Sequence, residues 1–300
     1  MSQMSVAARL IWEALYLKYG YDFRGYSPAS LSRRLEFCMS RFGYLSETEL
    51  LAKLLDDPTF IHQILPHLTI TTTELFRSPD SFRRYKESIF PVLKTYPSVN
   101  IWIAGCSTGE EIYSLAILLH EEGLLERTTI YATDINPEAL KRAQQGIYSS
   151  SIIPDFVKNY TAAGGQSQPS DYYSTDYDLV RFKSFLKDNV VFFEHNLVTD
   201  EVFVQTHLVL CRNVLIYFEK ELQDRALNLF AKSLIQFGFL GLGDKESLSF
   251  SSSAPYFTTI DARERVFKRN SLNLSGTTEM AELNPADKEL DGGKNQTTHS

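Results

Sequence analysis

VNIWIAGCSTGEE, residues 99–111, is the stretch of this sequence that decides the fold. Its first six residues are mostly apolar, as in a strand that is buried inside a sheet. A turn of small residues follows, and apolar residues then recur at helical spacing, at Ile112, Leu115, Ala116 and Leu119. A strand, a tight turn and a helix in this order predict one unit of an α/β fold.

Further strands and helices alternate after this unit. The expected strands are TTIYATD (128–134), VVFFEHN (190–196), HLVLCRN (207–213) and FLGLG (239–243). Asn136-Pro137 caps a predicted helix that ends at Gly146, and another helix is expected over about residues 219–237. The alternation predicts a largely parallel sheet wrapped by helices.

Three parts of the chain depart from this alternation. Residues 1–90 carry apolar residues at helical spacing and predict an all-helical N-terminal domain. Residues 149–188 combine a GGQSQPS loop with short aromatic pieces, which favours a small antiparallel β-subdomain inserted into the α/β domain of residues 91–270. Residues 271–300 are mostly polar, so we expect a disordered tail.

The composition excludes several classes of protein. The net charge is −7 without a long basic run, so we expect no nucleic-acid partner. The three cysteines form no CxxC pair and the six histidines show no HExxH spacing, so we expect neither a disulfide framework nor a metal site. The N-terminus predicts an amphipathic helix rather than a signal peptide, and no apolar run reaches about 18 residues. We therefore expect a cytoplasmic protein without membrane insertion.

The expected strand ends carry the features of a nucleotide-type cofactor site. Ligands of open parallel sheets bind beyond the carboxyl ends of the strands. Gly105 and its small neighbours, directly after the first strand, let the backbone approach a ligand closely. Asp134, at the end of the next strand, is placed to accept hydrogen bonds from ribose hydroxyls.

The charge of the turn favours S-adenosylmethionine over a dinucleotide. A dinucleotide site needs a G-x-G-x-x-G turn to bring a helix N-terminus onto the pyrophosphate, whereas this turn has only Gly105 and Gly109. Glu110 and Glu111 follow at once, and would repel a pyrophosphate but favour a sulfonium and an ammonium group. Alternatively, these acids only complement the helix dipole, with Thr108 and Glu111 as a capping box.

On these features the chain resembles the CheR-type chemoreceptor glutamate methyltransferases, over about residues 5–270. The segments that carry the resemblance are LTITTTELFR (68–77), IWIAGCSTGEEIYSLA (101–116), ATDIN (132–136), GIY (146–148), FFEHNL (192–197) and CRNVLIYF (211–218). The resemblance implies a helical N-terminal domain, a Rossmann-like class I methyltransferase sheet and an inserted β-subdomain. It also implies S-adenosylmethionine as cofactor and S-adenosylhomocysteine as product.

The resemblance implies particular contacts as well. The positions that match the family's cofactor contacts are Thr71, Thr73, Arg77, Glu111, Asp134, Asn196, Leu197, Cys211 and Arg212. Arg77 and Tyr217 match residues placed near the transferred methyl group. The sequence departs from the family at Thr71, where Asn is usual, and at Asp244, where the family's GHSE has its His.

The expected chemistry needs alignment rather than a base, because a glutamate carboxylate is already ionised at neutral pH. We assign Arg77 to positioning, since its planar guanidinium can hold a carboxylate in a fixed orientation. Tyr217 is expected to donate to the carboxylate or to contact the methyl and sulfur; alternatively, it is an ordinary aromatic residue at a strand–helix junction. Arg212 suits a substrate carboxylate or the cofactor's own carboxylate.

The expected partners are chemoreceptor cytoplasmic helices, and we expect a monomeric enzyme. Arg33 and Arg34, with Arg24 and Arg41 nearby, form either a basic face that meets acidic receptor helices, as in the family, or a solvated helix face. Three functions stay open: O-methylation of receptor glutamates, methylation of another protein or a small carboxylate, and a non-catalytic module that binds S-adenosylmethionine.

Overall fold

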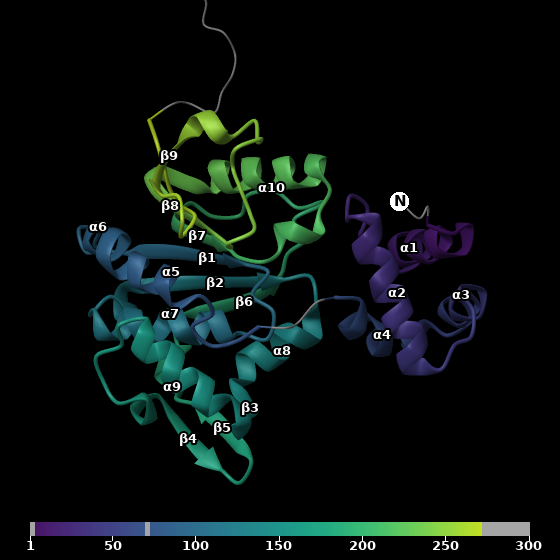
Figure 1. Cartoon of the computed structure of the whole chain (residues 1–300), viewed down its shortest axis with the longest axis horizontal. Coiled ribbons are helices and arrows are strands. Elements are labelled where there is room, and N and C mark those ends of the chain that lie inside the picture. Colours follow the sequence, from purple (N-terminus) through teal and green to yellow (C-terminus); the bar gives the residue numbers. More distant parts are fainter. Residues whose placement is uncertain (1–3, 70–72, 272–300) are drawn as a thin grey trace, which may run out of the picture.

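The computed structural model describes residues 4–69 and 73–271, and its architecture confirms the predicted fold class. Helices form the N-terminal part, a seven-stranded mixed sheet forms the centre, and a separate three-stranded antiparallel sheet projects from it (Figure 1). Apart from Ser271, the predicted tail lies outside the described residues. None of the described helices is long and apolar enough to cross a membrane.

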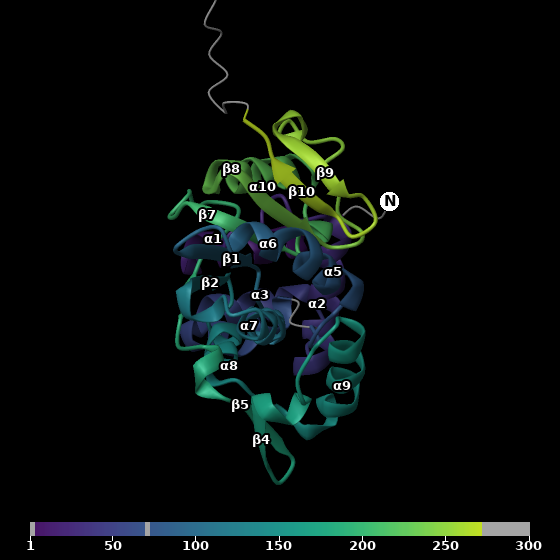
Figure 2. The same ribbon diagram turned by 90° about the vertical axis from the view of Figure 1, so that its left-hand side faces the viewer.

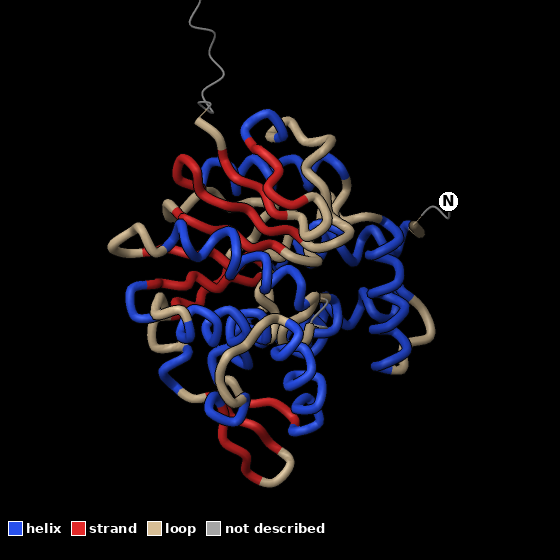
Figure 3. Tube along the Cα trace, turned by 60° about the vertical axis from the view of Figure 1, so that its left-hand side comes forward, coloured by secondary structure: helices blue, strands red, loops and turns tan. Residues whose placement is uncertain are grey.

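The N-terminal part consists of helices, and serines mark the starts of the first three in the sequence. Ser5 accepts a hydrogen bond from the backbone N–H of Ala8, and Ser27 and Ser46 cap the next two helices in the same way. The helices are α1 (Val6–Tyr19), α2 (Pro28–Phe42), α3 (Glu47–Asp56) and α4 (Ile61–Leu68). Their apolar faces meet in a core of their own around Leu35, and Figure 3 shows this part as helices and loops.

The central sheet divides the remaining core between two layers. In spatial order its strands are β6 (Val190–Glu194), β2 (Thr128–Asp134), β1 (Val99–Ala104), β7 (Thr206–Cys211), β8 (Leu234–Leu242), β10 (Val266–Arg269) and β9 (Phe257–Asp261). The first five are parallel, and β10 and β9 add to them in antiparallel pairs. Because successive side chains of a strand point to opposite faces, Ile103 packs in the core with α7 (Glu110–Glu121), whereas Trp102 packs with α10 (Lys220–Ser233).

The order of the strands creates a crevice at one edge of the sheet. From β1 the chain continues to β2 and β6 on one side, whereas β7 and β8 fill the other side. Such a switch point leaves a ligand-sized space beyond the carboxyl ends of the strands. The helices that complete this domain are α5 (Pro79–Arg84), a π-helical turn (Tyr85–Ile89), α6 (Phe90–Leu93) and α8 (Pro137–Gln145). Asn136 caps α8, as predicted.

The helix predicted for residues 219–237 is wrong at its end. α10 stops at Ser233, and Leu234 already begins β8. Phe237, with a φ of 63°, and a register shift opposite β7 mark the irregular first half of this strand. The apolar residues of this short segment fit a helical period and a strand period equally well, so the pattern does not separate the two elements.

The inserted β-subdomain contains a helix that the sequence pattern did not indicate. Its strands β3 (Ile147–Ser149), β5 (Leu179–Phe182) and β4 (Tyr173–Asp176) pair antiparallel in that spatial order. Between β3 and β4 the chain forms α9 (Ile153–Ala162), which buries Phe156 and Tyr160 in the core with α7. Figure 2 shows the β4–β5 hairpin at the opposite end of the molecule from β9 and β10.

Candidate active site

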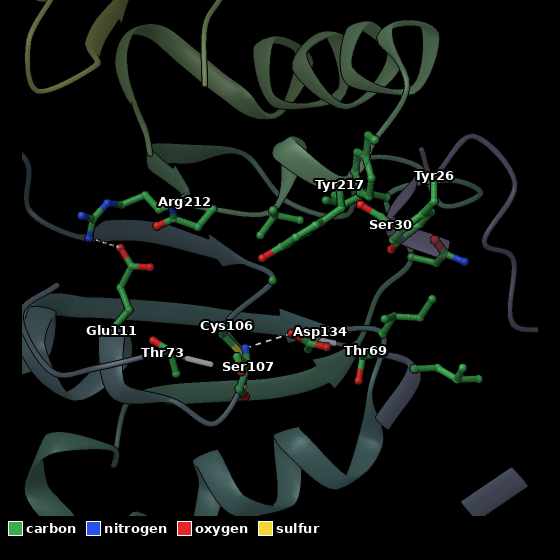
Figure 4. A pocket seen from close by; sticks show the side chains of 18 of the residues that line it. Tyr26, Ser30, Thr69, Thr73, Cys106, Ser107, Glu111, Asp134, Arg212 and Tyr217 are labelled. Atoms are coloured by element: carbon green, nitrogen blue, oxygen red, sulfur yellow. Dashed lines mark hydrogen bonds and ion pairs between the residues drawn. The ribbon is translucent and has the colours of Figure 1, made fainter. Parts of the chain in front are cut away.

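One cavity gathers the strand ends at the switch point (Figure 4). The space between its walls, open solvent at its mouth included, is roughly 1180 Å³. Nine of the predicted site residues line it: Thr73, Arg77, Gly105, Glu111, Asp134, Asn196, Leu197, Arg212 and Tyr217. The fold therefore brings together side chains that lie far apart in the sequence.

Two predicted cofactor contacts are not in this set. Cys211 ends β7 with its side chain fully buried in the core with α10, and it does not line the cavity. Burial raises the pKa of the Cys211 thiol well above its usual range. The contact of Cys211 with a cofactor stays a prediction, and it would have to be made by the backbone of Cys211. Thr71 lies outside the described residues.

The turn after β1 brings backbone rather than side chains to the cavity. Gly105 has a φ of 70°, in the left-handed region that favours glycine, and a Cβ there would stand 2.4 Å from Cγ2 of Val214. Ser107 donates its backbone N–H to the carboxylate of Asp134 at 2.9 Å. The turn is thereby fixed to the end of β2, and its first residue, Gly105, has no room for a side chain.

Asp134 is the last residue of β2 and anchors this side of the cavity. Its two oxygens accept hydrogen bonds from the backbone N–H groups of Ser107 and Asn136, each at 2.9 Å. An ionised carboxylate has about four acceptor positions, so about two remain for the hydroxyls of a ligand. Burial raises the pKa of Asp134, and the backbone donors oppose that rise. The free acceptor positions fit the hydroxyls of a ribose.

Replacing Asp134 with Ala is expected to weaken the binding of S-adenosylhomocysteine about 10- to 100-fold, because hydrogen bonds to a charged acceptor contribute about 1.5–3 kcal/mol. Isothermal titration calorimetry measures the change. Glu138→Ala, on the exposed start of α8, is the matched control and should bind as the unchanged protein does. Equal affinities of the two variants would remove the ribose assignment.

The two acids at the start of α7 have different environments. The helix begins after Gly109 without a side-chain cap, so the predicted capping box of Thr108 and Glu111 is wrong. Thr108 instead donates its hydroxyl to the carboxylate of Glu110 at 2.7 Å. Glu110 is buried outside the cavity, whereas Glu111 extends along the cavity wall (Figure 4). Only Glu111 is available to a ligand.

Glu111 forms an ion pair with Arg212 at one end of the cavity. Oε1 of Glu111 lies 3.1 Å from Nη1 of Arg212, whose side chain is only 3% exposed. Arg212 also donates to the backbone carbonyl of Arg77 at 2.7 Å, and its guanidinium lies 5.3 Å from the ring centre of Phe82. Burial opposes the charged form of Arg212, but the Glu111 carboxylate raises its pKa above the ordinary value. Arg212 is thus a fixed counter-charge that orients Glu111.

Arg77 brings a second cation to the same cavity. Among the described residues, no carboxylate lies within the 4.0 Å of an ion pair from its guanidinium. Thr73 lines the cavity from the same segment of the chain. A guanidinium without an acidic partner can receive a carboxylate through two parallel hydrogen bonds. The pairing of Arg212 with Glu111 leaves this role to Arg77.

Tyr217 enters the cavity from the side opposite the β1 turn. It ends a short helical turn (Leu215–Tyr217) after β7. In Figure 4 its ring reaches toward the middle of the cavity, across from Cys106. Its side chain therefore borders the ligand space, and is not simply packed at a strand–helix junction.

The N-terminal helices also border the cavity, which no feature of the sequence indicated. The residues that line it from this part are Phe23, Tyr26, Ser30, Leu31, Arg34, Leu68 and Thr69. Backbone bonds hold the two parts together: the N–H of Ser27 donates to the carbonyl of Tyr217 at 2.8 Å, and the N–H of Glu219 donates to the carbonyl of Gly25. No local motif signals such a contact, because it joins segments that are far apart in the sequence.

The four arginines considered as a basic face have separate environments. Arg24 forms an ion pair with Asp22 at 2.6 Å, and Arg33 and Arg41 are exposed to solvent. Arg34 is half-buried and lines the cavity. Within the described parts of the chain, its guanidinium has no acidic partner within 4.0 Å. The cavity therefore has a cationic side chain from each of the two parts of the molecule.

The sequence matches two family models that together span most of the chain. The "CheR methyltransferase, all-alpha domain" matches residues 8–69, and the "CheR methyltransferase, SAM binding domain" matches residues 71–266. The second model covers the strand ends that line the cavity, and S-adenosylmethionine is thereby the cofactor. The chemistry of the cavity's acceptors agrees with it, because the carboxylates of Asp134 and Glu111 suit a ribose and an ammonium group.

Individual relatives also match this chain over most of its length. Cher3 of Pseudomonas putida, named as a methyltransferase, is 51% identical over 265 residues, which are 88% of this chain and 97% of that protein. A 104.1-kDa protein of Rhodobacter capsulatus is 31% identical over 86% of this chain, which spans 27% of that longer protein. A chemotaxis protein methyltransferase of Listeria monocytogenes is 27% identical over 76% of this chain and 85% of its own length.

Proposed function

Because this chain belongs to the CheR methyltransferase family, we propose that it transfers the methyl group of S-adenosylmethionine to glutamate side chains on the cytoplasmic helices of chemoreceptors. The relative from Listeria monocytogenes, a chemotaxis protein methyltransferase by name, supports a role in chemotaxis. We further propose that the protein acts in the cytoplasm as a monomer.

The observation that carries the choice of substrate is the distribution of charge in the cavity. Three carboxylates line it, Glu74, Glu111 and Asp134, and Glu111 already neutralises Arg212. Arg77 and Arg34 line the same cavity without an acidic partner among the described residues. An anionic acceptor would be stabilised beside these two guanidinium groups.

The mechanism follows from what these residues can hold. When bound, S-adenosylmethionine would supply a methyl group on a positively charged sulfur; an ionised carboxylate would take the methyl group as the carbon–sulfur bond breaks, and S-adenosylhomocysteine would leave. Asp134 would hold the ribose hydroxyls, and Oε2 of Glu111, which has no partner among the described residues, would receive the ammonium group. Arg77 orients the acceptor carboxylate, and Tyr217 bounds the space where donor and acceptor meet. Alignment and exclusion of water then supply the rate enhancement.

The proposal is tested by incubating the protein with methyl-labelled S-adenosylmethionine and the soluble cytoplasmic domain of a chemoreceptor. Label should enter the receptor domain and be released as methanol by mild alkali, because carboxylate esters are base-labile and methylamines are not. A parallel reaction without the receptor domain, and one with free glutamate, are the controls.

Other outcomes would select the alternatives. Alkali-labile label on another protein or on free glutamate would support a related enzyme with a different acceptor. Binding of S-adenosylhomocysteine by calorimetry, without transfer to any acceptor, would support a non-catalytic module. Alkali-stable label on the receptor domain would contradict the choice of carboxylate.

A further inference from the structure

Glu246 is a buried carboxylate that binds the segment between two site residues. It follows β8 by four positions, and its side chain is only 3% exposed. Its two oxygens accept four backbone N–H groups, from Gly243 at 2.6 Å, Asn213 at 3.1 Å, Val214 at 2.8 Å and Leu215 at 2.8 Å. Four donors fill the acceptor positions of a carboxylate.

Three of these donors belong to the turn that joins Arg212 to Tyr217. The turn has a strained start, since Asn213 has a φ of 62°, in the left-handed region. Val214 also packs over Gly105 so closely that a Cβ on that glycine would clash with it. The bonds to Glu246 therefore fix the backbone of a turn that lies directly against the cofactor side of the cavity.

The two ends of this turn are held differently. Arg212 has its own anchors, in the carboxylate of Glu111 and the backbone carbonyl of Arg77. Tyr217 has a backbone bond to Ser27, but none of the described residues forms a hydrogen bond with its side chain. Loosening of the turn would hence displace Tyr217 more than Arg212.

Within the segment Gly243-Asp244-Lys245-Glu246, Gly243 and Glu246 hold the turn, whereas Asp244 contributes little to it. A Cβ on Gly243 would stand 2.8 Å from the backbone nitrogen of Asn213 and from Oε2 of Glu246, so only glycine fits. Asp244 is exposed, and its nearest contact to the turn is a 3.5 Å bond from the side-chain amide of Asn213. The departure from the family at Asp244 therefore leaves the bonds of Glu246 intact.

We infer that Glu246 is a positioning residue for methyl transfer, which holds the 213–217 turn so that Tyr217 faces the acceptor. The inference rests on the proposed function for the reaction that it assists. Glu246 itself does not line the cavity and touches neither cofactor nor acceptor. Its effect on the reaction passes through Tyr217.

The test compares Glu246→Gln with Asp244→Asn, which changes a charge in the same segment and keeps an oxygen that can accept the 3.5 Å bond from Asn213. The amide introduced by Glu246→Gln would point its N–H groups at two of the four backbone donors, so half of the bonds would be lost. We expect kcat with the receptor domain to fall at least about 10-fold, while the affinity for S-adenosylhomocysteine changes less than about threefold. Asp244→Asn should match the unchanged protein in both.

A second variant covers the case in which Glu246→Gln does not fold. Gly243→Ala keeps the carboxylate of Glu246, but its added Cβ would press against the backbone nitrogen of Asn213. It should lower kcat while the affinity for S-adenosylhomocysteine stays nearly unchanged. An unchanged kcat in a folded variant would overturn the inference, as would equal losses of kcat and cofactor affinity.

The outcome for the unchanged protein separates the two claims. If the unchanged protein does not methylate the receptor domain, the proposed function fails and no positioning role for it remains. If it does, and folded Glu246→Gln keeps full kcat, the inference alone fails. Hydrogen exchange at the amides of residues 213–215 gives an independent reading: Glu246→Gln should speed it at least about 10-fold, and unchanged exchange would contradict the bonding itself.

Discussion

Replacement of Arg77 with Ala is expected to lower the rate of methyl transfer to a receptor domain at least about 100-fold, because loss of alignment alone has effects of this size. The variant removes only the guanidinium. The bond from Arg212 to residue 77 uses the backbone carbonyl and survives the substitution. The fall in rate should therefore exceed the fall in cofactor affinity, although Arg77 is also a predicted cofactor contact.

The measurement for Arg77 is single-turnover transfer at saturating S-adenosylmethionine, with calorimetry for cofactor affinity. Arg83→Ala, an exposed arginine on the adjoining helix α5, is the matched control and should keep full activity. Arg77→Lys should recover part of the rate, since it restores the charge without the planar fork. Full activity of Arg77→Ala would refute the positioning role.

Replacement of Glu111 with Ala is expected to destabilise the protein by about 3 kcal/mol, because it leaves the buried Arg212 without its counter-charge. The same change should weaken S-adenosylhomocysteine binding at least about 10-fold, because a carboxylate that receives an ammonium group is lost. Urea unfolding measures the first effect, and calorimetry measures the second.

The exposed pair of Glu138 and Lys141 provides the control for stability. Glu138→Ala should change the free energy of unfolding by less than about 1 kcal/mol, as expected for a surface ion pair. The double variant Glu111→Gln with Arg212→Met removes both charges and should regain stability but not cofactor affinity. A loss in Glu111→Ala no larger than in Glu138→Ala would show that Arg212 does not depend on this ion pair.

The sheet could be predicted because the sequence patterns that specify it lie within short segments. The strand–turn–helix of residues 99–111 and the acid at the end of the next strand each lie within one short segment. Parallel strands bring their carboxyl ends to one edge whatever the loops between them do. For that reason Gly105, Glu111 and Asp134 could be expected to meet, and all three line the cavity.

The remaining parts of the site depend on contacts between distant segments. Tyr26 reaches the cavity only because the N-terminal part packs against Phe218; the ring centres of Tyr26 and Phe218 are 4.7 Å apart. No sequence pattern indicated the role of Glu246, because its four backbone donors surround it only once β7 and β8 lie side by side. Sequence patterns report burial and period, and they do not report which backbone groups a buried carboxylate will find.

The resemblance to a family added what these patterns could not supply. Charge at the β1 turn favoured a cationic cofactor, but it did not distinguish a carboxylate acceptor from other acceptors. The structure adds that Arg212 is committed to Glu111, so that Arg77 and Arg34 are the cationic side chains left to meet an acceptor among the described cavity residues. This separation of paired and unpaired charges is the physical basis of the proposed substrate.

The most direct measurement is tandem mass spectrometry of a chemoreceptor cytoplasmic domain after reaction with the protein and S-adenosylmethionine. We expect the added methyl on glutamate side chains, in amounts that grow with time and vanish in Arg77→Ala. Methyl groups on lysine or on other nitrogen atoms, or a receptor domain that stays unmodified while the protein binds the cofactor, would contradict the proposed methylation of glutamate.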